Sequence, residues 1–255
     1  MSNTHAIAIT QGDSAGIGPE IIAKAFRDHA SELQGCFVAG DVATLRRAAQ
    51  AITGPGQAHL PVAVIAAPQD AWTVPLRCIP VLQLPDMPPP APWGQVSAQA
   101  GAAAAHSVQW AARAALRGEI AALVTAPLHK EALHAAGVDY PGHTELLQAE
   151  AAAHAGVGLA QMPVRMMLAN HELRTVLVSI HVSLRQAIEA VTFDNVLQTL
   201  RITHDALTRM LGRAPRIGVA GLNPHAGEGG LFGQEELTII APAVAGLNAE
   251  GLDIA

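Results

Sequence analysis

The sequence is poor in aromatic side chains although half of it is apolar. Aromatic residues make up only 3% of its 255 residues, and alanine is abundant. The core must therefore be built from aliphatic side chains and from helices that pack closely together. A chain of this length and apolar content can bury a core in one large domain or in two modest ones.

Cysteine and positive charge are also scarce. Cys36 and Cys78 both lie in apolar, strand-like surroundings, which predicts reduced, buried thiols and a cytoplasmic protein. We expect no signal peptide and no membrane-spanning segment, because no basic region precedes an apolar stretch and no apolar run is long enough. With 15 Lys and Arg against 21 Asp and Glu, the chain has no basic footprint for nucleic acid.

Strand-like and helix-like stretches alternate along the chain. Helical periodicity follows Pro19, an N-cap is expected at Asp41 and another at Thr192. Residues 80–92 carry six prolines and are predicted to be an extended excursion. Asn170-His171-Glu172 reads as a hairpin turn between two strands. The expected strands cover residues 5–10, 36–40, 62–66, 120–124, 163–168, 175–179 and 216–220.

The most informative stretch is residues 221–230, where a proline and four glycines surround Asn223, His225 and Glu228. It follows the strand expected at 216–220, and α/β proteins place their chemistry in such strand-to-helix loops. Glycines let a backbone turn sharply and approach a ligand closely. A tight turn with a solvated histidine is the alternative. The density of special backbone residues around one imidazole favours a site.

Other polar loops also follow expected strands. Residues 12–20 place three glycines and a proline at a helix start, but they match neither a Walker loop nor a dinucleotide turn and, taken alone, are more typical of a plain strand-to-helix connection. His143 stands between a glycine and Thr144, which can act as an N-cap. His181 ends an apolar strand, where it either faces a cleft or is satisfied by a backbone carbonyl at the core edge.

Five motifs in this order resemble the PdxA family, the 4-hydroxythreonine-4-phosphate dehydrogenases of vitamin B6 biosynthesis. The resemblance covers the whole chain. The motifs are Gly12-Asp13-Ser14-Ala15-Gly16-Ile17-Gly18-Pro19-Glu20, Thr125-Ala126-Pro127-Leu128-His129-Lys130, Gly142-His143-Thr144-Glu145, His181, and Leu222-Asn223-Pro224-His225-Ala226-Gly227-Glu228-Gly229-Gly230.

The resemblance implies a two-domain α/β fold similar to the isocitrate and isopropylmalate dehydrogenases, with the active site in a cleft between the domains. We expect a first domain over 1–135, completed in the family by a C-terminal segment, and a second over 136–255 that carries metal-site and dimer-interface residues. The family's enzymes are homodimers whose metal site lies at the subunit interface.

The family's activity implies NAD or NADP and a divalent metal such as zinc, cobalt or magnesium. The C3 hydroxyl of 4-phosphohydroxy-L-threonine is oxidised, and the 3-oxo acid loses carbon dioxide to leave 3-amino-2-oxopropyl phosphate. By position, His181 and His225 match two of three metal ligands, while His143 and Thr144 match substrate-binding residues. Imidazoles suit zinc or cobalt, and a divalent ion can polarise the reacting oxygen. The catalytic base and the phosphate-binding residues stay open.

The resemblance also shows departures. The third histidine ligand of the family, in a Tyr-His-Asp-Gln motif, has no counterpart within these 255 residues, so we expect weak metal binding and little turnover from the chain as given. Ser14 replaces a usual proline and His129 a common asparagine.

Three alternatives to the B6-pathway reaction follow from the sequence. A dehydrogenase of the same family could act on a four-carbon sugar-acid phosphate or an aromatic cis-dihydrodiol. A metal-dependent hydrolase or lyase would use the histidines without nicotinamide. An inactive, truncated metal-binding remnant is the third.

Overall fold

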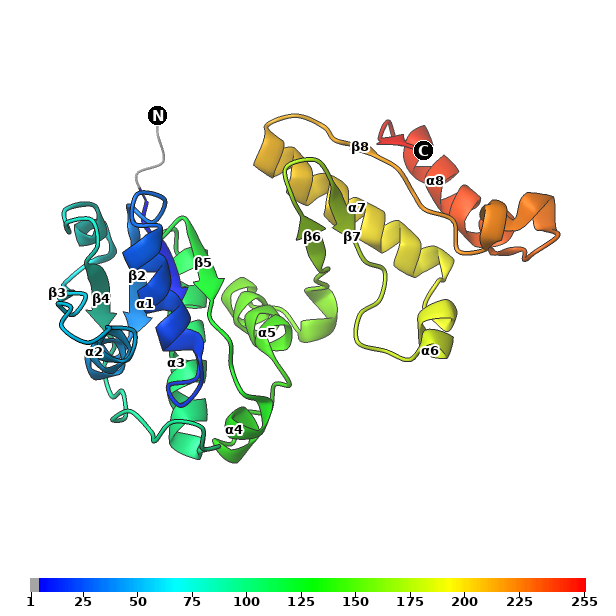
Figure 1. The fold of residues 1–255 in the computed structure, drawn as a ribbon. Helices are drawn as coiled ribbons and strands as arrows, with labels where there is room; N and C mark the ends of the chain where they lie inside the picture. The colour runs from blue at the N-terminus through cyan, green and yellow to red at the C-terminus, as the bar shows by residue number, and fades with distance from the viewer. Residues whose placement is uncertain (1–4) are drawn as a thin grey trace. The chain divides into compact units, whose positions relative to one another are not determined.

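The computed structural model describes residues 5–255, which form two compact α/β units (Figure 1). The first unit ends at Pro163 and the second comprises Val164–Ala255. This division falls later than the domain boundary expected after residue 135, because the helices that follow that point pack on the first unit. No helix within residues 5–255 is long and apolar enough to cross a membrane.

The first unit contains a five-stranded parallel sheet in the order β3-β4-β2-β1-β5. Its strands are β1 (Ile7–Thr10), β2 (Cys36–Gly40), β3 (Val62–Ile65), β4 (Ile79–Gln83) and β5 (Ala122–Thr125). Its helices are α1 (Gly18–Asp28), α2 (Val42–Ala51), α3 (Ala98–Leu116), α4 (Lys130–Ala135) and α5 (His143–Ala155), with short 3-10 turns at Pro68–Trp72 and Leu159–Gln161.

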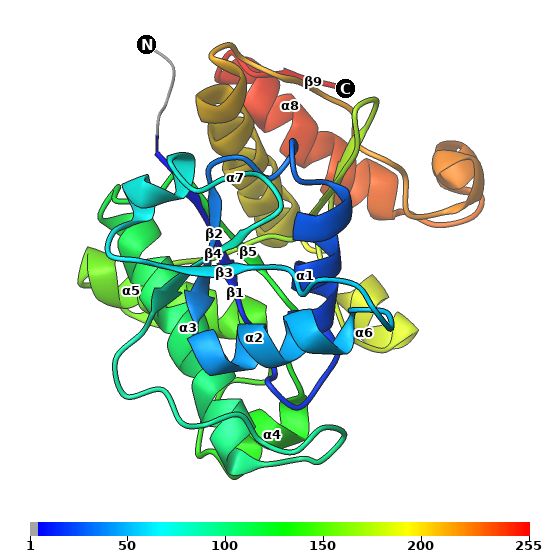
Figure 2. The ribbon, with the colours of Figure 1, turned by 60° about the vertical axis from the view of Figure 1, so that its left-hand side comes forward.

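The two faces of this sheet bury different side chains because successive residues of a strand point to opposite sides. Ile9 and Val38 face α1 and α2, where they join Leu45 in one apolar cluster. Ala8 and Phe37 face the opposite way and pack on α3 in a second cluster. Helices therefore cover both faces, as Figure 2 shows, and the parallel sheet is buried as such sheets generally are.

Strand β4 was not expected from the sequence, because Pro80 placed it in the predicted proline-rich excursion. Pro80 pairs with Ala63 of β3, but the ladder between β4 and β2 begins only one residue later, at Val81 and Val38. Ile79 donates its amide to Pro61 on the β3 side at 2.9 Å, so the amide that proline lacks would point to the other side. The missing donor therefore interrupts no strand pairing.

Helix α3 begins at Ser97, which accepts the Ala100 amide at 3.0 Å. Gly101 of this helix lies against the backbone of Ala132 in α4, so closely that an added Cβ would overlap the Ala132 carbonyl. Farther along α3, Arg113 binds Glu150 of α5 through two hydrogen bonds of 2.7 and 3.0 Å. The close contact and the ion pair hold α4 and α5 on the first unit.

The second unit is built on two helices and two small sheets. Antiparallel β6 (Met167–Ala169) and β7 (Arg174–Val176) form the expected hairpin, and β8 (Arg216–Ile217) pairs in parallel with β9 (Asp253–Ile254). Thr192 caps α7 (Phe193–Leu211), as predicted, and α7 packs on α8 (Ala241–Ala249) around Leu200 and Leu247. Short α6 (Leu184–Glu189), a 3-10 turn at Pro224–Gly230 and a π-helical turn at Glu236–Ile240 complete it.

Candidate active site

The carboxyl ends of β1 and β5 meet where the connections of the first sheet change direction. From β1 the chain moves to β2 on one side, while β5 lies on the other side of β1. The loop after β1 is tied to the loop after β5, because the Asp13 amide donates to the Pro127 carbonyl at 2.9 Å. Gly12, at φ 69°, packs against that same carbonyl. Such switch points are where open α/β sheets bind ligands.

Two buried polar side chains at the end of β1 lack protein partners within residues 5–255. Thr10 and Gln11 are both fully buried, and neither the Thr10 Oγ1 nor the Gln11 Nε2 has a hydrogen bond. The Oε1 of Gln11 accepts the Asp41 amide at 2.7 Å, which fixes the orientation of this side chain. Unpaired buried polar groups are rare and cost free energy, so this end of the sheet is suited to bind a polar ligand.

His143 and Thr144, the predicted substrate-binding residues, occupy the first turn of α5. Both are half-buried. Thr144 lies inside the helix and does not cap it, because Gly142 is the N-cap residue and supplies no side-chain hydrogen bond. The His143 Nε2 is buried and has no partner within the described residues. Burial lowers the pKa of His143 below its ordinary value, and a hydrogen bond with the Ala126 backbone opposes part of this change.

The lowered pKa of His143 predicts a pH-dependent stability of the first unit. Because the folded unit holds this imidazole neutral, the unfolded chain binds more protons below about pH 6.5, and stability falls as pH decreases. We expect the parent to lose more stability between pH 7 and 5 than His143→Gln does. Urea unfolding followed by tryptophan fluorescence measures this difference, and equal losses in the two proteins would contradict the prediction.

Arg47 fastens the loop after β1 to the proline-rich segment. Its guanidinium donates to the carbonyls of Ser14 at 2.6 Å and Ala91 at 2.7 Å, and lies 5.0 Å from the centre of the Trp93 ring. The Gly94 amide adds a hydrogen bond to Ala15 at 2.9 Å. Residues 84–97 are therefore a strap held against the loop that begins α1. The carbonyl of Ser14 is the atom that Arg47 binds, so the proline common in the family would leave this contact intact.

The two predicted metal ligands lie in the second unit and share an uncommon backbone conformation. His181, between β7 and α6, has φ 55°, and His225 has φ 51°. Only six described residues other than glycine have positive φ, and these two histidines are among them. Both are exposed. Residues kept in this region by their surroundings cluster at functional sites.

His225 begins a run of left-handed backbone. Residues 225–229 all have positive φ, and three of them are not glycine: His225, Ala226 and Glu228. Left-handed conformation costs roughly 1–2 kcal/mol for each such residue, so the turn stores strain on the order of 3 kcal/mol or more. The His225 ring lies 6.1 Å from the ring of Phe232, counted between centres. Strain of this kind persists only where other contacts hold it.

Glu236 supplies contacts at the base of this turn, and sequence reasoning missed it. The residue is buried, and its carboxylate accepts the amides of Leu222 and Asn223 at 2.8 and 2.7 Å. Hydrogen bonds from the side chain and backbone of Asn223 lower its pKa to about 2. The available signal was a pair of acidic residues, Glu235 and Glu236, directly after a glycine-rich loop.

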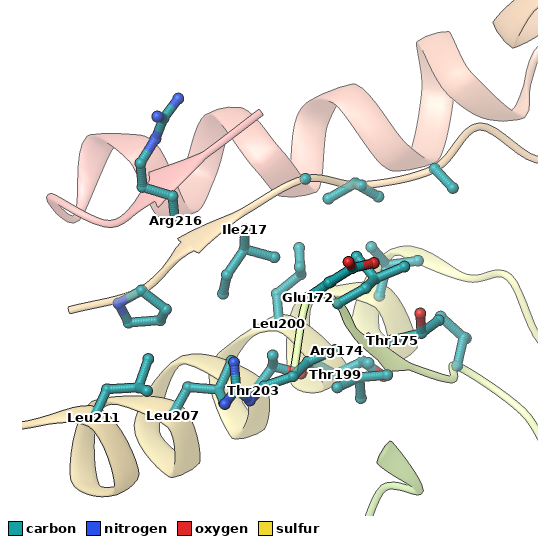
Figure 3. Close-up of a pocket in the computed structure, with 18 of the residues that line it drawn as sticks. Glu172, Arg174, Thr175, Thr199, Leu200, Thr203, Leu207, Leu211, Arg216 and Ile217 are labelled. Carbon is teal, nitrogen blue, oxygen red and sulfur yellow. The ribbon is translucent and has the colours of Figure 1, made fainter. Parts of the chain in front are cut away.

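A cavity of about 680 Å³ lies elsewhere in the second unit, between α7, the β6–β7 hairpin and β8. Leu200 and Leu207 of α7 line one side and Ile217 of β8 another (Figure 3). None of the four predicted site residues lines it. Residues 5–255 also contain no cluster of three or more His, Cys, Asp or Glu side chains with the arrangement of a metal site.

Comparison with known proteins gives these loops a context. Residues 32–255 match the family described as pyridoxal phosphate biosynthetic protein PdxA. The chain belongs to the PdxA family. A 4-hydroxythreonine-4-phosphate dehydrogenase of Beijerinckia indica is 44% identical, with 98% of this chain and 70% of the relative covered. A D-threonate 4-phosphate dehydrogenase of Salmonella typhimurium is 40% identical, with 98% and 73% covered.

The PdxA fold is also shown by a solved structure. A 4-hydroxythreonine-4-phosphate dehydrogenase from Klebsiella pneumoniae superposes with a TM-score of 0.85 at 40% identity, covering 98% of this chain and 72% of that one. The α/β fold class that the resemblance to the PdxA family implied is thereby confirmed. The PdxA assignment rests on the whole chain, including the motifs that carry His143, His181 and His225.

Proposed function

We propose that this PdxA-family protein is a dehydrogenase that oxidises the C3 hydroxyl of 4-phosphohydroxy-L-threonine with NAD or NADP. Decarboxylation of the 3-oxo acid then yields 3-amino-2-oxopropyl phosphate, in the biosynthesis of pyridoxal phosphate. Relatives of 40–44% identity that carry this dehydrogenase name support the proposal. The observation in the structure that carries it is the buried, unpartnered Nε2 of His143 beside the carboxyl end of β5.

His143 and Thr144 are proposed to bind the substrate at the start of α5. The 13-residue helix begins without a side-chain cap, so amides of its first turn are free to receive an anionic group. The His143 Nε2 is placed to bond a substrate oxygen. Because its pKa is lowered, the ring is neutral at pH 7, and since its one N–H is used by the hydrogen bond with the Ala126 backbone, the Nε2 is left to accept a hydrogen bond.

His181 and His225 are proposed to hold the divalent metal. Two exposed imidazoles on constrained backbone suit zinc or cobalt better than magnesium, because magnesium prefers oxygen ligands. A bound divalent ion would act as a Lewis acid toward the substrate oxygen. The chain's own part is to hold the two rings in fixed positions. We include a homodimer with the metal site at the subunit interface, as the family resemblance implies.

A cytoplasmic location is part of the same proposal. Cys36 and Cys78 are both free and buried, and burial raises the pKa of each thiol. Such thiols are inert packing residues that suit a reducing compartment.

Calorimetry with the 255-residue chain tests the substrate assignment without depending on turnover. We expect 4-phosphohydroxy-L-threonine to bind and His143→Ala to bind it about tenfold more weakly, since the hydrogen bond at the buried Nε2 is lost. His154→Ala is the matched control, because His154 is exposed at the other end of α5. Any NADH that forms should require substrate and divalent metal together.

The same titration separates the substrates. Preferential binding of D-threonate 4-phosphate or of an aromatic cis-dihydrodiol would assign the protein to another reaction within the family. The Salmonella relative named D-threonate 4-phosphate dehydrogenase is the observation that keeps the sugar-acid phosphate as the second candidate. Equal affinity of the parent and His143→Ala would contradict the role given to His143.

A further inference from the structure

The left-handed turn that carries His225 is fastened at one carboxylate. Glu236 opens the π-helical turn Glu236–Ile240, and its Oε1 accepts the Leu222 and Asn223 amides at 2.8 and 2.7 Å. Its Oε2 accepts the Asn223 side-chain amide at 2.9 Å. These three hydrogen bonds bind the residues that come immediately before Pro224 and His225, so they set the point from which the turn departs.

The turn is also folded directly against this carboxylate. A Cβ on Gly227 would lie 2.8 Å from the Glu236 Oε2, and one on Gly221 would lie 3.4 Å from Oε1. Gly227 is the one buried residue of the left-handed turn, whereas its neighbours Ala226 and Glu228 are exposed. The contacts inside the turn are local, such as the Ala226 amide to the Asn223 carbonyl at 3.1 Å. Glu236 therefore provides the anchor from outside the turn.

Glu235 makes a different and smaller contact with the same segment. Its Oε2 accepts the Asn223 side-chain amide at 2.7 Å and no backbone amide of the turn. The Asn223 nitrogen thus donates to two carboxylates, which fixes the direction of its amide group: a flipped amide would turn its oxygen toward both. Glu235 and Glu236 are adjacent and carry the same charge, yet only Glu236 holds the backbone.

We propose that Glu236 is a positioning residue that holds the His225 turn in its left-handed form and so presents the imidazole for metal binding. The inference rests on the proposed role of His225. It assigns to Glu236 no contact with metal or substrate. Removal of a residue that orients a metal ligand typically lowers metal affinity by 10–100-fold, and removal of the ligand itself lowers it further.

Glu236→Gln tests the proposal with little change in volume. The glutamine oxygen can still accept the two backbone amides, but its NH₂ group would face the NH₂ group of Asn223, and an Asn223 flip would oppose Glu235. We expect hydrogen exchange of the peptide covering 220–232 to become about tenfold faster without metal. Zn²⁺ affinity should fall about tenfold in calorimetry, and the visible absorption of bound Co²⁺ should change. Glu235→Gln, the matched control, should change affinity by less than about twofold.

The two measurements distinguish failure of the inference from failure of the proposed function. Unchanged hydrogen exchange in Glu236→Gln overturns the positioning role, whatever its Zn²⁺ affinity. The role is also overturned if Glu236→Gln binds Zn²⁺ as tightly as the parent while His225→Ala binds it more weakly. If His225→Ala binds Zn²⁺ as the parent does, the metal role of His225 is wrong, and faster exchange in Glu236→Gln still shows that the carboxylate holds the turn. Equal urea midpoints of the variants would confirm that folding is retained.

Discussion

Replacing Gly101 with alanine should destabilise the first unit, by about 1–3 kcal/mol. The added methyl group would overlap the Ala132 carbonyl, and backbone on both sides leaves no flexible side chain to move away. Helices α3 and α4 would have to separate, and α4 follows directly on the loop that starts after β5. The effect is opposite in sign to the usual result, since alanine normally stabilises a helix interior relative to glycine.

Gly246→Ala is the matched control because Gly246 lies inside α8 with open space around it. There we expect a gain of about 0.5–1 kcal/mol. All three tryptophans, at 72, 93 and 110, belong to the first unit, so their fluorescence in urea reports Gly101→Ala selectively. Circular dichroism follows both units. A Gly101→Ala protein as stable as its parent would show that α3 and α4 do not meet through this backbone contact.

His225→Ala should reduce Zn²⁺ affinity by about 100-fold. Structural zinc sites with four ligands bind with about 10–16 kcal/mol, which is roughly 2.5–4 kcal/mol for each ligand, so one imidazole corresponds to at least about two orders of magnitude. The substitution removes the imidazole ring, but alanine, like histidine, must still adopt the left-handed backbone conformation at this position. Calorimetry with Zn²⁺ alone measures the change, and no nicotinamide or substrate is needed.

His171→Ala is the control for that measurement. His171 lies exposed at the turn of the β6–β7 hairpin, so it has the same residue type, the same unit and similar solvent access. Its removal should change the affinity by less than about twofold. If the two variants lose Zn²⁺ affinity equally, the zinc is bound by scattered surface histidines, and His225 is not a specific ligand.

Local patterns predicted much of the fold because they depend on neighbouring residues. The N-caps at Asp41 and Thr192 are confirmed by side-chain hydrogen bonds to Thr44 and Asn195. The hairpin around Asn170 is confirmed as well, and its side chain accepts amides from Glu172 and Leu173. A capping oxygen or a turn residue acts on groups two or three positions away, so the sequence contains the whole interaction.

Features that depend on distant contacts were missed. Pro80 made a strand unexpected at 79–83. Only the register against β2, which begins at Val81, shows that the missing amide of Pro80 interrupts no strand pairing. Strand β9 was not among the expected strands, yet it pairs with β8 across 36 intervening positions of the chain, with Ile217 in register with Ile254. Glu236 is 13 residues from Asn223, and no spacing rule connects a carboxylate to a backbone amide at that separation.

For the predicted site residues, the sequence indicated positions but not conformations. Sequence motifs located His143, Thr144, His181 and His225, and their roles stay predictions that the measurements above address. What the sequence could not indicate is the conformation that singles out two of them. Glycines near His225 suggested a sharp turn, but the left-handed angles of His225, Ala226 and Glu228 fall on residues that ordinarily avoid them.

The small sheets of the second unit have a consequence for how the protein behaves at high concentration. Within the described residues, β7 and β8 each pair with a single neighbouring strand, and both border the cavity lined by α7. Two-stranded sheets are marginal alone, and an open strand edge beside apolar side chains is a template for pairing with another chain. We therefore expect self-association at high concentration to begin at these strand edges of residues 164–255.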